Sequence, residues 1–258
     1  KTIYKNHKKK FEIVILTDYL ITKEEEKNFK NFKIIKSQLF NRKSRLNKLF
    51  NLLSIFIIGK NLFIEKFLLK YNISIISHTH YLGKNSKIPS IKWFPDFQEL
   101  KFPENFSFKQ KIARKLDIFL ASIHSTKILI SSKSVQRDLK KINKKAYLNS
   151  LVLYHTTNID KNIKLAKLKY LKKKYKIKKI FFFLKNKKKK NKNHIVVFQA
   201  IKELKKKIKN ITVVTSGNSN DYRFPDHYSN LEIFIKKEKL NKNILYLGII
   251  PLKDVYSL

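Results

Sequence analysis

The sequence predicts an α/β protein built from two parallel-sheet units. Short runs of β-branched and aromatic residues alternate with helical patterns along the 258 residues. Such alternation is typical of parallel strands joined by helices that cover the sheet. The pattern restarts after a lysine-rich helical run at 164–179, which we interpret as a connector. We therefore expect two domains, over residues 1–160 and 161–258.

The first domain is predicted to contain six strands. They are expected at 11–17, 32–35, 73–77, 90–94, 127–132 and within 147–155. Helical patterns run up to Tyr71, from 107 to 124 and from 134 to 142. Ser107 is the expected N-cap of the second of these, because a serine hydroxyl accepts a hydrogen bond from the first helical turn.

The second domain repeats the pattern with three strands. They are expected at 180–184, 211–217 and 243–248, with helices at 193–208 and 228–240 and another beginning near the C-terminal end. In open α/β sheets, ligands bind beyond the carboxyl ends of the strands. That rule selects the loops at 77–89, 95–106, 131–134, 185–193 and 216–226.

The charge balance is strongly basic, with a net charge of +41. Only five of the 59 basic residues are arginine, the residue preferred for bidentate contacts with phosphates and bases. We therefore expect a solvated basic surface and no specific nucleic-acid partner, although general polyanion binding stays open. A basic face also favours anionic lipid headgroups. The absence of cysteine excludes disulfides and thiolate metal sites, and it is consistent with a cytosolic protein.

The most apolar stretch is Leu49–Tyr71, and four charged residues interrupt it. It is too broken for a membrane-spanning helix, so we expect an amphipathic helix pair that is either buried or membrane-facing. Residues 1–10 lack the apolar region of a secretory signal. The chain contains no methionine, and we expect residues to be missing at both ends.

The loop "KWFPDFQELKFPENFS" at 92–107 combines aromatics, prolines and polar residues. Pro95 and Pro103 exclude the interior of a helix at these positions. Asp96, Gln98 and Glu99 are interleaved with apolar side chains. Two interpretations stay open: an irregular connector pinned by aromatic residues, or a shaped polar pocket at the end of a strand.

Two loops of the second domain have features of an anion site. The lysines of 185–193 precede a helix, where backbone N–H groups and ammonium charges converge, although a solvated lysine run is the alternative. The run lacks the glycines of a P-loop. In the other loop, Gly217 allows close backbone approach, and Asn218, Asn220 and Asp221 are turn formers.

The sequence contains no His and carboxylate cluster that demands a metal, and no hydrolase triad. His78 and His80 follow the strand expected at 73–77. We interpret this pair as polar lining of a post-strand loop.

Four segments in order carry a family resemblance: "IKWFPDFQELKFPENFS", "ILISSKSVQRDLKKI", "KNKKKKNKNHIVVFQAIKEL" and "VVTSGNSNDYR". Together they resemble family-4-type retaining glycosyltransferases, also called group 1, over most of the chain from Phe11 onward. The resemblance implies the GT-B architecture, in which two Rossmann-like domains face a cleft. It assigns the acceptor mainly to the first domain and the nucleotide-sugar donor mainly to the second.

The resemblance also implies roles for individual residues. Lys192, Asn193 and His194 match the family's donor loop, and Lys192 is the candidate that neutralises the donor diphosphate. The weaker donor-binding candidates are Gly217, Asn218, Asn220 and Arg223.

The acceptor-side loop matches the family at "WFPDFQE". Its candidates are Asp96, Gln98 and Glu99, and we add His78 to the acceptor side. Asp96, Glu99 and Lys192 are the catalytic candidates.

The chain departs from the family pattern in four ways. Glu99 stands where relatives often have His, and the residues preceding Lys192 are all Lys or Asn, where relatives often carry an aromatic residue. The glycine-rich first loop and the paired-glutamate donor region of the family have no counterpart in residues 1–258. We therefore do not expect this stretch to catalyse transfer by itself.

The expected function is hexosyl transfer with retention, from a nucleotide sugar to a glycan or lipid-linked acceptor. The pathway implied is surface polysaccharide or lipopolysaccharide synthesis. No cofactor or metal is expected, and the expected location is the cytoplasm, with peripheral contact at the inner face of an anionic membrane. The alternatives are another GT-B-like sugar-nucleotide enzyme, such as an epimerase, and a non-enzymatic basic protein that binds polyanions or membranes.

Overall fold

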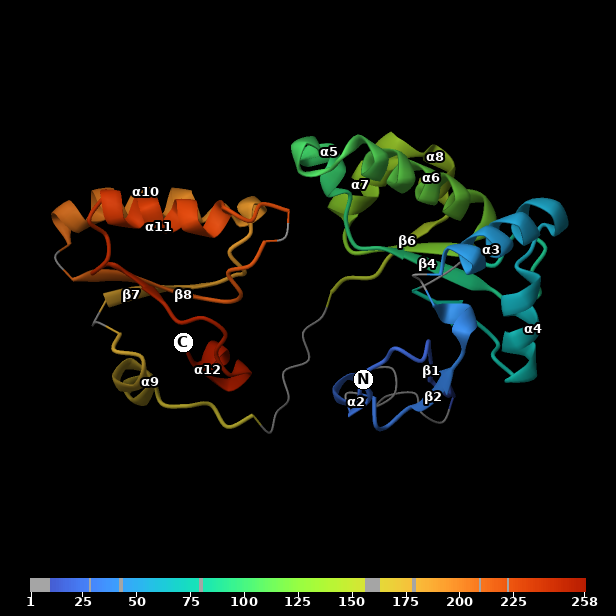
Figure 1. Ribbon diagram of the computed structural model, residues 1–258, viewed down its shortest axis with the longest axis horizontal. Coiled ribbons are helices and arrows are strands. Elements are labelled where there is room, and N and C mark those ends of the chain that lie inside the picture. The colour runs from blue at the N-terminus through green and yellow to red at the C-terminus, as the bar shows by residue number, and fades with distance from the viewer. Residues whose placement is uncertain are drawn as a thin grey trace. The chain divides into compact units, whose positions relative to one another are not determined.

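The structure is a computed structural model that describes residues 10–27, 29–41, 44–78, 81–155, 163–177, 180–208, 210–221 and 223–258 (Figure 1). The chain divides into two compact units, Lys1–Asn158 and Ile159–Leu258. All strand pairs within the described ranges are parallel. The prediction of an α/β protein with parallel sheets is therefore confirmed.

The strands of the N-terminal unit form two parallel sheets. One sheet pairs β1 (Val14–Thr17) with β2 (Lys33–Lys36). The other has the order β3-β4-β5-β6, with β3 at Ile76–Ser77, β4 at Ser90–Phe94, β5 at Lys127–Ile130 and β6 at Ser150–Val152. Within the described residues, β1 and β3 are therefore edge strands of separate sheets.

Helices connect these strands, and polar side chains cap several of them. They are α2 (Lys23–Lys27), α3 (Arg45–Ile58), α4 (Leu62–Lys70), α5 (Gln98–Lys101), α6 (Phe108–His124), α7 (Lys133–Ile142) and α8 (Lys144–Leu148), with 3₁₀ turns η1 (Gln38–Phe40) and η2 (Pro103–Asn105). Ser107 caps α6 and forms a capping box with Gln110, which confirms the predicted helix start.

Two apolar clusters hold the N-terminal unit together. In the first, Phe94 and Phe97 pack with Ile118 of α6 and with Ile128 and Ile130 of β5. Figure 1 shows α6, α7 and α8 on one side of β4 and β6. In the second cluster, the α4 side chains Ile64 and Leu68 pack with Phe40, Ile76, Leu82 and Ile88.

The described strands of the C-terminal unit form a three-stranded sheet with helices on both faces. The strand order is β7-β8-β9, with β7 at Ile180–Lys185, β8 at Ile211–Ser216 and β9 at Ile244–Tyr246. Its helices are α9 (Leu168–Lys174), α10 (His194–Lys207), α11 (His227–Lys237) and α12 (Leu252–Ser257), with the turn η3 (Lys190–Lys192). Figure 1 shows α10 and α11 on one face and α9 and α12 on the other. Every residue of the central strand β8 is buried.

The predicted connector at 164–179 contains the short helix α9, and residues 178–179 lie outside the described ranges. A buried carboxylate joins α9 to α12. Asp254 accepts hydrogen bonds from Lys174 Nζ at 2.6 Å and from the Tyr175 hydroxyl at 2.5 Å. These bonds hold the pKa of Asp254 below its ordinary value.

Several predicted strands are shorter in the structure, and the strand predicted at 73–77 changes most, being reduced to Ile76–Ser77. The strand expected within 147–155 is present as β6, Ser150–Val152. The residues before it belong to α8, because the Asn143 side chain accepts a hydrogen bond from the Ala146 N–H and starts this short helix.

Candidate functional site

In the C-terminal unit, the loops after β7 and β8 lie against each other. Gly217 has a φ of +121°, and a Cβ atom there would lie 2.8 Å from the Asn186 carbonyl oxygen. The Lys188 N–H donates to the Asn218 carbonyl at 2.9 Å. Only glycine tolerates this backbone conformation and approach, so the two predicted donor loops form one surface.

The buried carboxylate of Asp221 makes a second connection between these loops, at Lys190. Its Oδ2 accepts from the Lys190 N–H at 3.2 Å, and its Oδ1 accepts from the Arg223 N–H at 3.3 Å. The Arg223 guanidinium lies 3.6 Å from the same Oδ1. Sequence reasoning gave Asp221 only a turn-forming role, since nothing in the pattern indicated that its side chain is 1% exposed.

The predicted motif Lys192-Asn193-His194 lies where η3 passes into α10. Asn193 has a left-handed backbone, with φ +49°, and makes no side-chain hydrogen bond to the helix. The first N–H groups of α10 are therefore not capped by the Asn193 side chain. Unpaired N–H groups and the positive end of the helix dipole favour an anion at such a position.

His194 is fully buried directly behind this helix start. Burial, reinforced by the nearby Lys188 charge, lowers the pKa of His194 to about 4. The Asn186 backbone raises this pKa, but its effect is smaller than that of burial. The imidazole is therefore neutral at pH 7. Neither ring nitrogen makes a hydrogen bond of ordinary geometry to the rest of the described chain.

One lysine of the loop is buried and another is exposed. Lys188 is 2% exposed, and its Nζ lies 4.5 Å from the centre of the Tyr246 ring. Nζ has no hydrogen-bond partner among the described residues, and burial lowers the pKa of Lys188 to about 8. Lys192 is exposed at the end of η3. Since the run contains only Lys and Asn, no pattern in it indicates which lysine is buried.

In the N-terminal unit, the loop at 95–106 folds around an arginine. Arg114 of α6 forms an ion pair with Glu99, with Nε and Oε2 2.8 Å apart, and its Nη2 donates to the Asp96 carbonyl at 3.1 Å. Gln98 Nε2 donates to Asp96 Oδ2 at 2.9 Å. The structure therefore brings together the three polar candidates of this loop.

Arg114 itself was not among the site residues predicted from the sequence. Its guanidinium also lies 5.3 Å from the centre of the Phe106 ring. The scarcity of arginine was an available indication, because an arginine retained in a lysine-rich chain points to a bidentate or stacked contact.

His78 lies at the end of β3 and has a φ of +66°. Its Nδ1 is 2.7 Å from Ser77 Oγ, its ring centre is 5.4 Å from that of Trp93, and burial lowers its pKa. The ring centre of Trp93 also lies 5.4 Å from that of His155, so the single tryptophan packs against two histidines. His80 lies outside the described residues.

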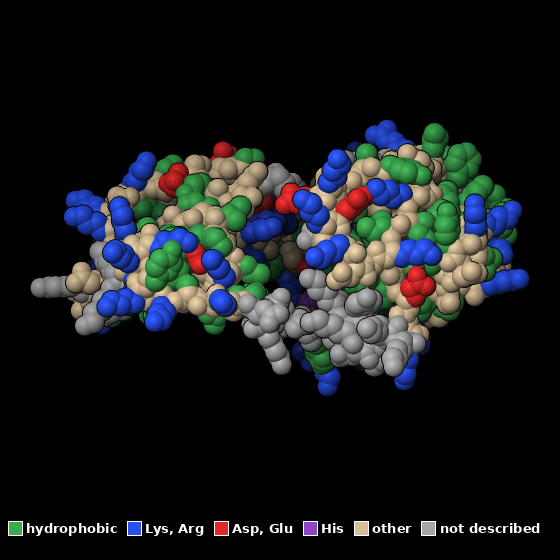
Figure 2. Space-filling view, turned by 90° about the horizontal axis from the view of Figure 1, so that it is seen from below, with side chains coloured by type: hydrophobic (Ala, Val, Ile, Leu, Met, Phe, Trp, Pro, Cys, Tyr) green, Lys and Arg blue, Asp and Glu red, His purple; other side chains and the backbone are tan. Residues whose placement is uncertain are grey.

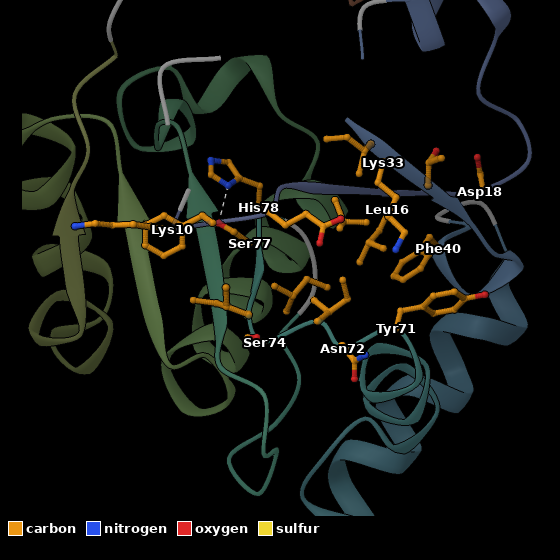
Figure 3. A pocket seen from close by; sticks show the side chains of 18 of the residues that line it. Lys10, Leu16, Asp18, Lys33, Phe40, Tyr71, Asn72, Ser74, Ser77 and His78 are labelled. Carbon is orange, nitrogen blue, oxygen red and sulfur yellow. Dashed lines mark hydrogen bonds between the residues drawn. The ribbon is translucent and has the colours of Figure 1, made fainter. Parts of the chain in front are cut away.

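A cavity of about 840 Å³ borders His78 (Figure 3). Its walls come from the edge strands of the two N-terminal sheets, with 14–18 on one side and 71–78 on the other. Figure 3 shows Ser77 and His78 facing Leu16 and Phe40 across it. Asp96, Gln98 and Glu99 are not among its lining residues, so the structure does not bring His78 into one cavity with them.

Across the described part of the chain, no three His, Cys, Asp or Glu residues gather as a metal site would require. In the same part, every helix is too short or too polar to cross a membrane.

The sequence matches no family model and no curated protein. Its fold matches that of GT-B glycosyltransferases, which confirms the predicted fold class. A glycosyltransferase from Rickettsia africae superposes with a TM-score of 0.63 at 16% identity, over 95% of this chain and 62% of that one. Anabaena Alr3699/HepE, in complex with UDP and glucose, superposes with a TM-score of 0.65 at 12% identity, over 96% of this chain and 64% of that one.

The chain therefore spans less than two thirds of the length of these similar structures. At identities this low, the superpositions establish a shared fold and nothing beyond it.

Proposed function

We propose that the protein transfers a hexose from a nucleotide sugar to a glycan or lipid-linked acceptor, with retention of the anomeric configuration. The observation that carries this proposal is the joined pair of loops after β7 and β8 at the start of α10. Such a position at the carboxyl ends of parallel strands suits a diphosphate. The similar fold of HepE, solved with UDP and glucose, supports the same assignment.

The donor side of the reaction falls to the C-terminal unit. Lys192 and the first turn of α10 face the departing diphosphate, whose oxygens gain negative charge as the glycosidic bond breaks. Asn193 and His194 belong to the same loop-to-helix junction. The facing loop supplies the remaining donor-binding candidates: Gly217, Asn218, Asn220 and Arg223. We propose that this stabilisation needs no metal or cofactor.

The acceptor side falls to the N-terminal unit. The anomeric carbon develops oxocarbenium character in glycosyl transfer, and a nearby carboxylate stabilises that charge. Asp96 and Glu99 are the candidate carboxylates, with Gln98 and His78 as acceptor contacts. Because Arg114 fixes the loop, these carboxylates are positioned before the acceptor binds.

The setting we propose is surface polysaccharide or lipopolysaccharide synthesis at the cytoplasmic side of a membrane. Residues 1–160 form the acceptor domain and 161–258 the donor domain in this assignment. The excess of lysine supports a peripheral association with anionic lipid and no specific nucleic-acid partner.

A titration of the whole protein tests the donor assignment. Nucleoside diphosphates and sugar nucleotides would be added at physiological salt, with a short DNA duplex as control. We expect saturable binding of one nucleotide, weakened at least tenfold in Lys192→Ala. The matched control is Lys207→Ala, at the other end of α10.

Two results would contradict the proposal. Nucleotide affinity that is equal in Lys192→Ala and wild type removes Lys192 from the site. Binding to DNA alone, fading as salt rises, identifies a general polyanion-binding protein instead.

A further inference from the structure

The solvent-facing side of α3 is apolar. Its exposed large side chains recur at intervals of three or four residues, which places them on one face of the helix. Their exposed fractions run from 44% for Leu53 to 80% for Ile57. The members are Leu46, Leu49, Phe50, Leu53, Phe56 and Ile57. Helices on the surface of a water-soluble protein normally present polar residues on this side.

A second exposed apolar stripe runs along α6. It consists of Phe108, Ile112, Leu116 and Phe119, each at least 50% exposed. The opposite face of α6, with Ile118 and Ala121, is buried in the core of the N-terminal unit.

The two helices are neighbours. The Phe56 and His124 ring centres are 6.5 Å apart, which joins the C-terminal ends of α3 and α6. Figure 1 shows both helices on the same side of β4. We name the two stripes together the α3–α6 surface.

Positive charge accompanies this surface. The segments of α3 and α6 contain six Lys or Arg residues, of which Arg114 is paired with Glu99, and a single acidic residue, Asp117. That carboxylate is already paired with Lys92 at 2.8 Å. Lys109 and Lys115 are exposed between the apolar residues of α6. Figure 2 shows Lys and Arg among hydrophobic side chains toward the end of the N-terminal unit where α3 and α4 lie.

We propose that the α3–α6 surface docks the protein on a bilayer with anionic headgroups. This inference rests on the peripheral membrane association included in the proposed function and is independent of glycosyl transfer. Apolar side chains flanked by Lys and Arg are the pattern of helices that lie in the membrane interface.

The lysines favour a bilayer over a protein partner as the occupant. In a dry protein interface, Lys109 and Lys115 would be buried without carboxylate partners unless the partner supplied them. On a bilayer, the apolar part of each lysine lies along the acyl boundary while its ammonium reaches a phosphate headgroup.

Vesicle co-sedimentation of the whole protein tests the proposal. The probes are vesicles of phosphatidylcholine alone and of phosphatidylcholine mixed with phosphatidylglycerol. We expect binding to the mixed vesicles, reduced by about tenfold or more in Ile57→Glu, since one large apolar side chain is withdrawn from lipid. The matched control is Ile233→Glu on α11, because Ile233 is also an exposed helical residue, at 61%. The control is expected to bind like the wild type.

Several outcomes would overturn the proposal. They are no wild-type binding to mixed vesicles, equal binding to phosphatidylcholine alone, and equal losses in the two variants. A wild-type dimer that Ile57→Glu dissociates, without any vesicle binding, would assign the surface to a second copy. Nucleotide titration of Ile57→Glu keeps the two proposals apart, because its nucleotide affinity is expected to equal that of the wild type.

Discussion

The two candidate loop regions differ in how their charged groups are satisfied. In the N-terminal unit, Glu99 is paired with Arg114, which also holds the Asp96 backbone. In the C-terminal unit, the buried Lys188 and His194 side chains make no hydrogen bonds to other described residues. The first region is thus set in place by its own contacts. The second has buried polar atoms whose hydrogen-bonding capacity is not used within the described chain.

Substitutions in the two loop regions should have different effects on nucleotide binding and on sugar transfer. The loss of kcat on substituting Lys192 is the largest effect that we expect. Lys192→Ala removes the charge that we propose faces the leaving group, and we expect kcat to fall by about 100-fold or more together with weaker nucleotide binding. Asp96→Asn should lower kcat by about 10- to 100-fold, with nucleotide affinity unchanged. Steady-state kinetics and nucleotide titration of both variants give the comparison. Equal losses of nucleotide affinity in the two would end the division into donor and acceptor sides.

The buried Lys188 should make the stability of the chain depend on pH. Its pKa is about 8 in the folded state and near 10.5 unfolded, so the unfolded state binds more protons between these values. The free energy of unfolding should therefore rise by about 2–3 kcal/mol across this window, and the penalty is largest below pH 8. Lys188→Met removes the charge at similar length, and it should abolish this rise and stabilise the protein at pH 7.

Denaturant unfolding at pH 7 and pH 10 checks this prediction. The informative quantity is the difference between wild type and Lys188→Met, because tyrosines and other lysines titrate in both. A difference that does not change with pH would show that Lys188 is not desolvated in the folded protein.

A smaller effect is expected on removing Arg114 of α6, which holds the loop at 95–106. Arg114→Met leaves the Glu99 side chain, which is 8% exposed, without its cation. We expect a loss of about 2 kcal/mol in the free energy of unfolding, since the Arg114 side chain is itself partly exposed. Glu99→Gln in the same chain should restore part of this loss. A double variant no more stable than Arg114→Met would mean that the ion pair does not position the loop.

Elements with local chemical markers could be predicted closely. The helix α6 begins where Ser107 and Gln110 form a capping box, and the strand Ser90–Phe94 has the predicted bounds. In both cases the determining interactions lie within a few residues. The loop "WFPDFQE" proved to be both pinned and polar, so neither of the two open interpretations was complete.

Contacts between distant segments could not be predicted. Arg114 and Asp96 are 18 residues apart, and Lys190 and Asp221 are 31 apart. Such pairs depend on how strands and loops lie side by side. The burial of Lys188 could not be predicted either, because a run of Lys and Asn has no apolar periodicity that indicates which residue faces inward.

The open edges of β1 and β3 bear on the solubility of the chain. Along the cavity between them, neither edge has another described strand beside it. An unpaired edge presents backbone N–H and C=O groups in a row and is a template for strand addition from another molecule. Lys10 and Lys33 line this opening together with the acidic Glu12 and Asp18, so the repulsion of a second copy comes from the net charge of +41 on the whole chain. At about 1 M salt, where charges act over only about 3 Å, that protection against aggregation is lost.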